Sequence, residues 1–179
     1  VSGLSFSYEA NDSGQTLDNT VAPRGQLGVV ADVRIGGHSI DGQTGGNTLA
    51  YNYFPDHGDM VIDTDNVSFY SNSSSNYIGL RNVLAHEFGH GMGLPHVTAN
   101  NSRQLMEGSI NTSFDGPQID DIHQAQRRYG DNWEENGGND AFSVATNLGI
   151  FDGTAMLIGA DANMGASVVE VDPDQVGVL

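Results

Sequence analysis

One eleven-residue run constrains this chain more than any other feature: residues 86–96 read H-E-F-G-H-G-M-G-L-P-H. His86 and His90 lie four positions apart, so on an α-helix both imidazoles project from the same face. Gly93 can adopt a backbone conformation closed to other residues, which lets the chain leave the helix sharply. That turn would bring His96 back towards the two helical histidines. The run therefore predicts a helix, a turn and three converging imidazoles.

Three imidazoles at one point favour a zinc ion, with His86, His90 and His96 as its ligands. Three protein ligands leave the fourth position to water, which is the arrangement of a catalytic zinc rather than a structural one. Glu87 follows the first ligand and is placed to take a proton from that water. The simpler alternative is a chance H-E-x-x-H with ordinary core or surface histidines. Five fixed positions that satisfy one geometry favour the zinc hydrolase interpretation.

The residues before the run continue a helical pattern. An apolar stripe that would pack the helix on a core is predicted from four residues: Leu80, Val83, Leu84 and Phe88. The histidines would then face a cleft.

Met106 lies ten residues after His96. Here the sequence resembles the metzincin metallopeptidases, whose zinc rests above a methionine-containing turn, and the resemblance assigns that turn to Met106. A methionine alone is weak support, because most methionines fill gaps in a core. Within the metzincins the chain is most similar to the matrixins, the matrix-metalloproteinase-like group, over most of residues 4–130.

The resemblance implies an α+β fold in which a twisted mixed sheet packs with an active-site helix and a C-terminal helix. Strands are expected at residues 4–9, at 30–36, at 48–55 (the edge strand above the cleft) and at 58–65, and the closing helix at 117–130. That helix also fits unaided, with Asp120 and Asp121 at its positive end and Arg127 and Arg128 at its negative end. Its buried stripe would be Ile119, Ile122, Ala125 and Tyr129.

Two departures from the matrixin pattern affect the expected fold. Matrixins carry a second, structural zinc, and the matching positions here form no plausible ligand set, so we expect a single zinc; they are Arg34, Gly36, Tyr51 and Val61. The family fold also begins with a strand and a long helix that nothing before residue 4 supplies. We therefore expect a domain that lacks this strand and helix.

Two acidic, glycine-containing loops are candidates for calcium, which prefers six to eight oxygen ligands. In matrixins a calcium links these loops, and the resemblance makes Asp41 and Asp63 the main ligands here. Gly42 would add a carbonyl oxygen, and Asn66 stands where the family usually has Glu. Ordinary polar turns are the alternative.

Composition restricts the possible partners. The net charge is −17, with six arginines and no lysine. Such a surface repels nucleic acid and anionic membranes and favours divalent cations. No apolar run approaches transmembrane length, and the absence of cysteine excludes disulfides. We expect a secreted monomer of bacterial type that acts on proteins or peptides, with no nucleic-acid or membrane partner.

Composition also predicts a domain boundary after residue 130. Residues 131–140 are polar and glycine-rich, which is typical of a linker. Residues 141–179 contain short strand-like stretches and predict a partial, β-rich C-terminal extension, too small for a secure core of its own. Residues 1–130 would form the catalytic domain.

The resemblance implies a zinc-dependent endopeptidase. An extended substrate would add a strand to the sheet edge along Leu49, Ala50 and Tyr51, and residues 107–117 would form the wall of a side-chain pocket. Two alternatives stay open at this point: a zinc-binding scaffold without peptidase activity, and a calcium-dependent surface or adhesion module.

Overall fold

A computed structural model describes residues 2–11, 14–17, 25, 29–45, 48–55 and 57–130. The chain divides into two compact units, one of Ser5–Ala125 and one of Val1–Leu4 with Gln126–Leu179. The first unit holds the strands of the described residues and the three histidines. The expected linker and C-terminal extension, residues 131–140 and 141–179, lie outside the described residues.

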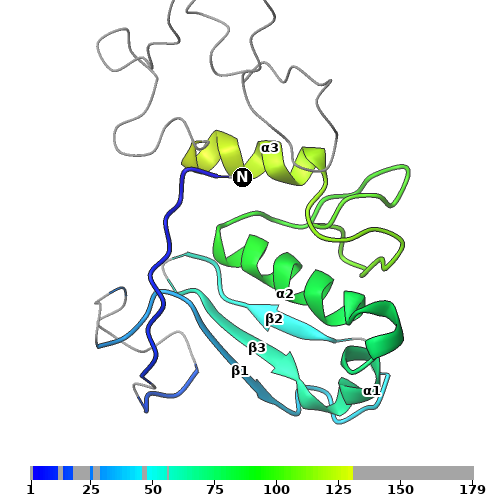
Figure 1. Cartoon of the computed structure of the whole chain (residues 1–179), viewed down its shortest axis with the longest axis horizontal. Coiled ribbons are helices and arrows are strands. Elements are labelled where there is room, and N and C mark those ends of the chain that lie inside the picture. Colours follow the sequence, from blue (N-terminus) through cyan, green and yellow to red (C-terminus); the bar gives the residue numbers. More distant parts are fainter. Residues whose placement is uncertain are drawn as a thin grey trace, which may run out of the picture. The chain divides into compact units, whose positions relative to one another are not determined.

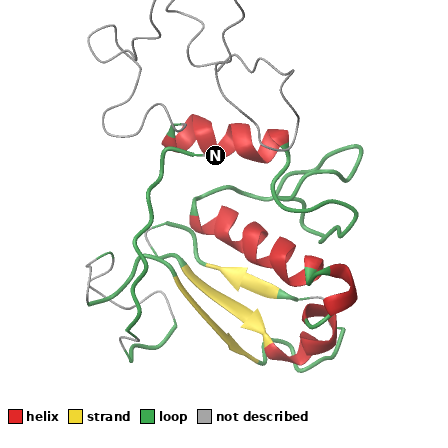
Figure 2. Ribbon diagram, in the orientation of Figure 1, coloured by secondary structure: helices red, strands yellow, loops and turns green. Residues whose placement is uncertain are grey.

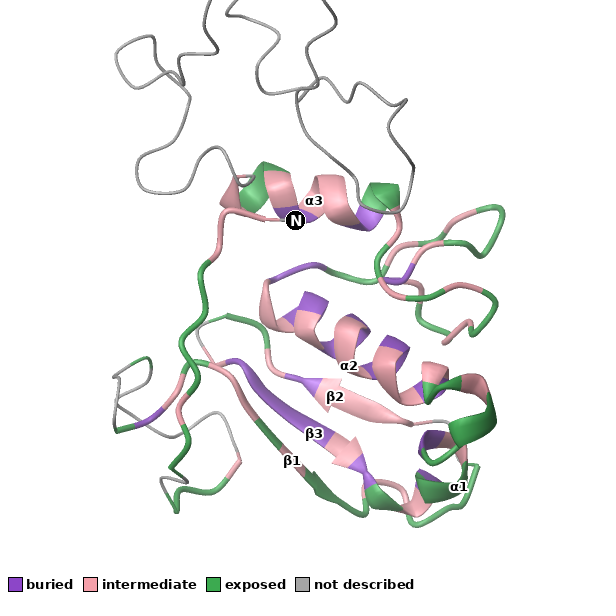
Figure 3. Cartoon of the chain, viewed as in Figure 1, coloured by how far each residue is buried: buried purple, intermediate pink, exposed green. Residues whose placement is uncertain are grey.

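The first unit is built on a three-stranded mixed sheet. Its strands are β1 (Arg34–His38), β2 (Ala50–Asn52) and β3 (Asp59–Asp63), in the spatial order β1-β3-β2. β1 runs parallel to β3 and β2 runs antiparallel to it, so β2 lies at an edge as the resemblance implies (Figure 1). The middle strand β3 is largely buried, whereas β1 is more exposed (Figure 3).

One face of the sheet is covered by α2 (Ile78–Gly91), which packs against β2 and β3 (Figure 2). The side chain of Asn52 in β2 donates from Nδ2 to the backbone oxygen of Glu87 in α2, at 2.7 Å. Short helical turns connect β3 to α2: η1 (Thr64–Asn66), α1 (Val67–Tyr70) and η2 (Ser73–Ser75). This arrangement fixes the helix of the H-E-x-x-H run beside the edge strand.

The predicted apolar stripe of α2 is only partly buried. Val83 is buried, but Leu80, Leu84 and Phe88 are half-buried. The buried face is instead mostly polar or small: Gly79, Asn82, Val83, His86, Glu87, Gly89 and His90. Polar side chains can face inward here because backbone groups of neighbouring loops replace their water, and a buried polar group with partners costs little.

The other face of the sheet is partly covered by residues 14–17. The guanidinium of Arg34 donates to the backbone oxygens of Gln15 (3.1 Å) and Thr16 (2.8 Å). It also forms an ion pair with Asp59, which is fully buried. A β-carbon added at Gly36 would lie 2.1 Å from Leu17 Cδ1, so the chain passes very close to β1 there. Arg34 is one of the positions matched to the second zinc of matrixins. Here its guanidinium is occupied by these hydrogen bonds and this ion pair.

The strand expected at residues 4–9 is wrong, because the structure assigns no strand to this segment. A strand needs a ladder of backbone hydrogen bonds with a neighbour. Here Phe6 packs its ring against Phe88 of α2, with centroids 5.4 Å apart, and Tyr8 is 91% exposed. In the part of the chain that the structure describes, this segment therefore contacts α2 through the ring of Phe6 and not through a backbone ladder.

The closing helix is α3 (Ile119–Tyr129), which begins two residues after Pro117. Its predicted buried stripe is partly wrong. Ala125 is buried, but Ile119 is 46% exposed, and the other buried residue of α3 is Asp121. The reason is a set of backbone contacts made by the Asp121 carboxylate, described below.

Candidate metal centre

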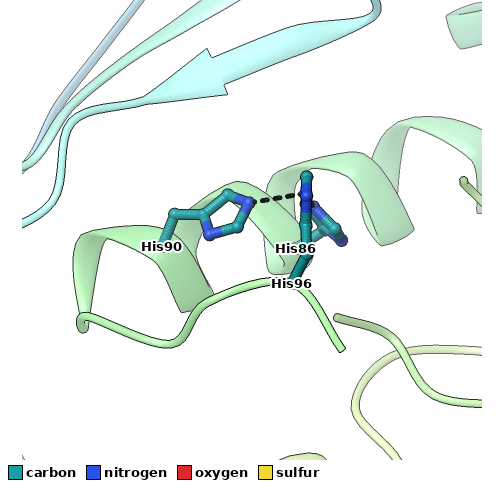
Figure 4. Close-up of side chains that lie close together, drawn as sticks. All are labelled: His86, His90 and His96. Atoms are coloured by element: carbon teal, nitrogen blue, oxygen red, sulfur yellow. Dashed lines mark hydrogen bonds between the residues drawn. The ribbon is translucent and has the colours of Figure 1, made fainter. Parts of the chain in front are cut away.

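The three histidines of the run converge as predicted (Figure 4). Nε2 of His96 lies 3.1 Å from Nε2 of His86 and 3.0 Å from Nε2 of His90. His86 and His90 come from the buried face of α2, and His96 from the loop that follows. Gly93 makes this return possible with a φ of 84°, and Leu94 N donates back to Gly89 O at 2.9 Å.

Backbone carbonyls orient the two helical imidazoles. Nδ1 of His86 lies 2.6 Å from the oxygen of Leu105, and Nδ1 of His90 lies 2.7 Å from the oxygen of Leu94. A carbonyl oxygen only accepts, so Nδ1 carries the proton in both rings. The lone pair of each Nε2 is therefore directed at the point where the rings meet, and histidines that bind zinc usually donate their other ring N–H to a carbonyl in this way.

The donor set fits a zinc ion. Burial lowers the pKa of His86 to about 4 and also lowers the pKa of His90, so both rings are neutral at pH 7. Neutral imidazole is the form that binds a metal. A tetrahedral zinc with Zn–N bonds of 2.0–2.1 Å would separate its nitrogens by about 3.3 Å, close to the separations found here.

Met106 packs against α2 at Gly89, which stands between His86 and His90 in the sequence. It is 1% exposed and belongs to a buried cluster with Leu94 and Ala125. A β-carbon added at Gly89 would lie 2.4 Å from the sulfur of Met106, so this glycine allows the thioether to approach the helix backbone. The turn that the resemblance assigned to Met106 stays a prediction.

Glu87 is 6% exposed, and its Oε2 is buried without a hydrogen-bond partner among the described residues. Burial raises the pKa of its carboxyl group to about 7. A buried acid with a raised pKa beside a metal-ligand cluster is typical of groups that exchange protons in a reaction.

The sequence of this chain matches the model of a known protein family. The sequence model of the family described as Matrixin matches residues 29–130, which is more than half of the chain and includes the sheet, α2 and the three histidines. The chain belongs to the matrixin family.

Two curated matrixin relatives agree with this assignment. The chain is 36% identical to matrix metalloproteinase-17 of Homo sapiens over 80 residues, which cover 41% of this chain and 13% of the relative. It is 37% identical to matrix metalloproteinase-25 of Mus musculus over 93 residues, which cover 48% of this chain and 15% of the relative. The alignments thus span less than a sixth of each relative.

One residue beside the histidine cluster of this matrixin was not expected from the sequence, Asp121 of α3. Its carboxylate is 3% exposed and accepts hydrogen bonds from the backbone nitrogens of Leu105 (2.8 Å), Met106 (3.1 Å) and Gln118 (2.8 Å). Leu105 in turn accepts the Nδ1 hydrogen of His86. The bond from Gln118 N resembles one half of a capping box, but residues 118–121 read Q-I-D-D and lack the usual sequence signal of Ser or Thr followed three residues later by Glu or Gln.

The matrixin calcium candidates are brought together differently from the prediction. Carboxylate oxygens of Asp41, Asp63 and Asp65 lie within 4.8 Å of one another, so Asp65 joins the two predicted acids. The Asn66 amide is engaged within the protein, accepting from Gly45 N at 2.8 Å and donating to Asp63 at 3.0 Å. Within the described ranges, this group and the histidine group are the two clusters suited to a metal ion.

Some backbone groups of the edge strand β2 face away from its neighbour β3. Leu49 O accepts from Asp63 N at 2.8 Å, and Tyr53 N donates to Asp59 O at 3.1 Å. Backbone groups alternate along a strand, so those of Ala50 and Asn52 face away from β3 while those of Tyr51 face it. Of the three residues predicted to bind substrate, Ala50 therefore has its backbone groups directed away from β3.

Among the helices described, none has the length and apolar composition needed to cross a bilayer.

Proposed function

We propose that this matrixin domain is a zinc-dependent endopeptidase. The observation that carries the proposal is the convergence of His86, His90 and His96 around one point, with the buried Glu87 on the same helix. The neutral, carbonyl-oriented imidazoles of His86 and His90, the third imidazole of His96, and an adjacent carboxyl group with a raised pKa are the groups that metal-assisted hydrolysis of a peptide requires.

The residues have distinct roles in the proposed reaction. His86, His90 and His96 would hold zinc, which would supply Lewis-acid chemistry and a water acidified towards a pKa of about 7. Glu87 takes up the proton of the attacking water and then passes it to the leaving amine. The backbone of Ala50 and Asn52 pairs with the extended substrate and orients it, as in strand addition to a sheet edge.

Cleavage of casein tests this function. We expect the purified chain to cleave casein, a chelator to abolish cleavage, and added zinc to restore it. Gel electrophoresis and zinc analysis on the same sample would report both properties. One bound zinc per chain without cleavage of casein or other unfolded proteins would contradict the proposal and favour the zinc-binding scaffold.

We further infer that Asp41, Asp63 and Asp65 hold a calcium ion that joins the two loops. Three carboxylates in one place repel one another, and a divalent cation removes that repulsion. Added calcium should therefore stabilise the zinc-loaded protein and raise its unfolding midpoint. At a calcium concentration one hundred times Kd, the free energy of unfolding should increase by about 2.7 kcal/mol.

Asp63→Asn is the matched variant for this calcium prediction and should lose most of the increase. Thermal unfolding followed by circular dichroism, with and without calcium at constant zinc, is the measurement. An equal midpoint in both buffers would contradict the calcium site. The adhesion-module alternative would require partner binding that depends on calcium and survives His86→Ala.

The acidic surface, with a net charge of −17 and no cysteine, supports an extracellular location, and we propose that the protein is secreted. We also propose that the chain consists of a catalytic domain (1–130), a linker (131–140) and a partial C-terminal extension (141–179). The bacterial type and the monomeric state are proposed on the same basis.

A further inference from the structure

A buried amide on α2 fastens a loop near the metal centre. Asn82 lies one turn before His86 and is 0% exposed. Its Nδ2 donates to the backbone oxygens of Asn111 (2.9 Å) and Phe114 (2.8 Å), and its Oδ1 accepts from Gly116 N (2.8 Å). Two carbonyls and one N–H fix the orientation of the amide, because a flipped amide would lose all three bonds.

The loop of residues 111–116 is attached to α2 a second time, at the surface. Arg81 forms an ion pair with Asp115, and both side chains are well exposed, at 36% and 62%. An exposed pair of this kind contributes little. The buried contacts of Asn82 are therefore the stronger attachment of the loop to the helix.

The same stretch of chain passes directly beside the metal ligands before it reaches Asn82. Leu105 accepts the Nδ1 hydrogen of His86, and a β-carbon added at Gly108 would lie 3.4 Å from Nδ1 of His96. Asn52 attaches the edge strand to α2 at Glu87. The strand and the loop are thus both fastened to the helix that carries two of the metal ligands.

We propose that Asn82 is a positioning residue that fixes the loop of residues 111–116 and thereby determines which substrate side chain fits beside the metal. The inference rests on the proposed peptidase function. Without the amide, three backbone groups lose their buried partners, and the loop must shift to find water or new partners. A shifted loop changes the space available to the residue that follows the cleaved bond.

The test compares Asn82→Ala with Arg81→Gln in the zinc-loaded protein. Both are assayed on peptides that differ only in the residue after the cleaved bond, either Gly, Leu or Phe. We expect the Leu-to-Gly and Phe-to-Gly ratios of kcat/KM to change by about 10-fold or more in Asn82→Ala, the effect of altered pocket contacts. Arg81→Gln should keep the ratios of the parent protein.

Hydrogen exchange of the Gly116 amide gives a readout that does not depend on activity. Asn82→Ala should remove the protection of this amide, while Arg81→Gln should retain it. A uniform fall in kcat/KM with unchanged ratios, equal ratio changes in both variants, or unchanged protection of Gly116 would each overturn the assignment. If the parent chain cleaves nothing, the proposed function fails, and exchange at Gly116 still decides whether Asn82 holds the loop.

Discussion

Glu87→Gln should lower the rate of peptide cleavage by about 10²- to 10⁴-fold, the usual contribution of a general acid–base group, while the protein keeps one zinc per chain. Gln has nearly the same shape as Glu but cannot accept and return a proton at neutral pH. The carboxylate is buried and its pKa is raised to about 7, so a neutral amide should not destabilise the fold.

Three measurements together test the role of Glu87: kcat on a fluorogenic peptide, zinc content by atomic emission, and the thermal unfolding midpoint. His96→Ala is the companion variant, because it removes a metal ligand and should lose zinc as well as activity. A Glu87→Gln protein that keeps more than about a tenth of the parent rate would exclude Glu87 as the base, since even a weak general base contributes more than that.

Asp121→Asn should lower the free energy of unfolding by about 3 kcal/mol and weaken zinc binding by about 10-fold. The carboxylate accepts three backbone N–H groups, at Leu105, Met106 and Gln118. An asparagine offers one acceptor oxygen, and its amide nitrogen would face at least one of these N–H donors. The backbone of Leu105 would then move, and with it the carbonyl that orients His86.

Asp120→Asn is the control for Asp121→Asn. The two aspartates are neighbours on α3, but Asp120 is exposed and accepts from Gln104 Nε2 at the surface. Its replacement should change the unfolding free energy by about 0.5 kcal/mol or less. Urea denaturation at constant zinc measures stability, and competition with a zinc-binding dye measures affinity. Equal effects of the two substitutions would show that the backbone contacts of Asp121 do not support the metal centre.

The sequence by itself determined the convergence of His86, His90 and His96, because its geometry is local. The four-residue spacing of His86 and His90 follows from the helical repeat, and Gly93 supplies the positive φ that returns His96 to them. Glu87 and Met106 could be proposed from the same run and the resemblance to matrixins. The edge position of β2 and the mixed sheet also followed from that resemblance.

Only the tertiary structure decided which polar groups are buried and why. From the sequence, Asp121 is expected only to carry a charge at a helix end, and Asn82 has no expected role. In the structure each side chain forms hydrogen bonds with three backbone groups. Asp65 joined the acidic cluster, and residues 4–9 failed to form a strand. Each outcome depends on which backbone groups distant segments bring within hydrogen-bond reach. Local periodicity does not specify those partners. Burying a polar group without a hydrogen-bond partner costs free energy, so the tertiary contacts decide which polar groups can be buried.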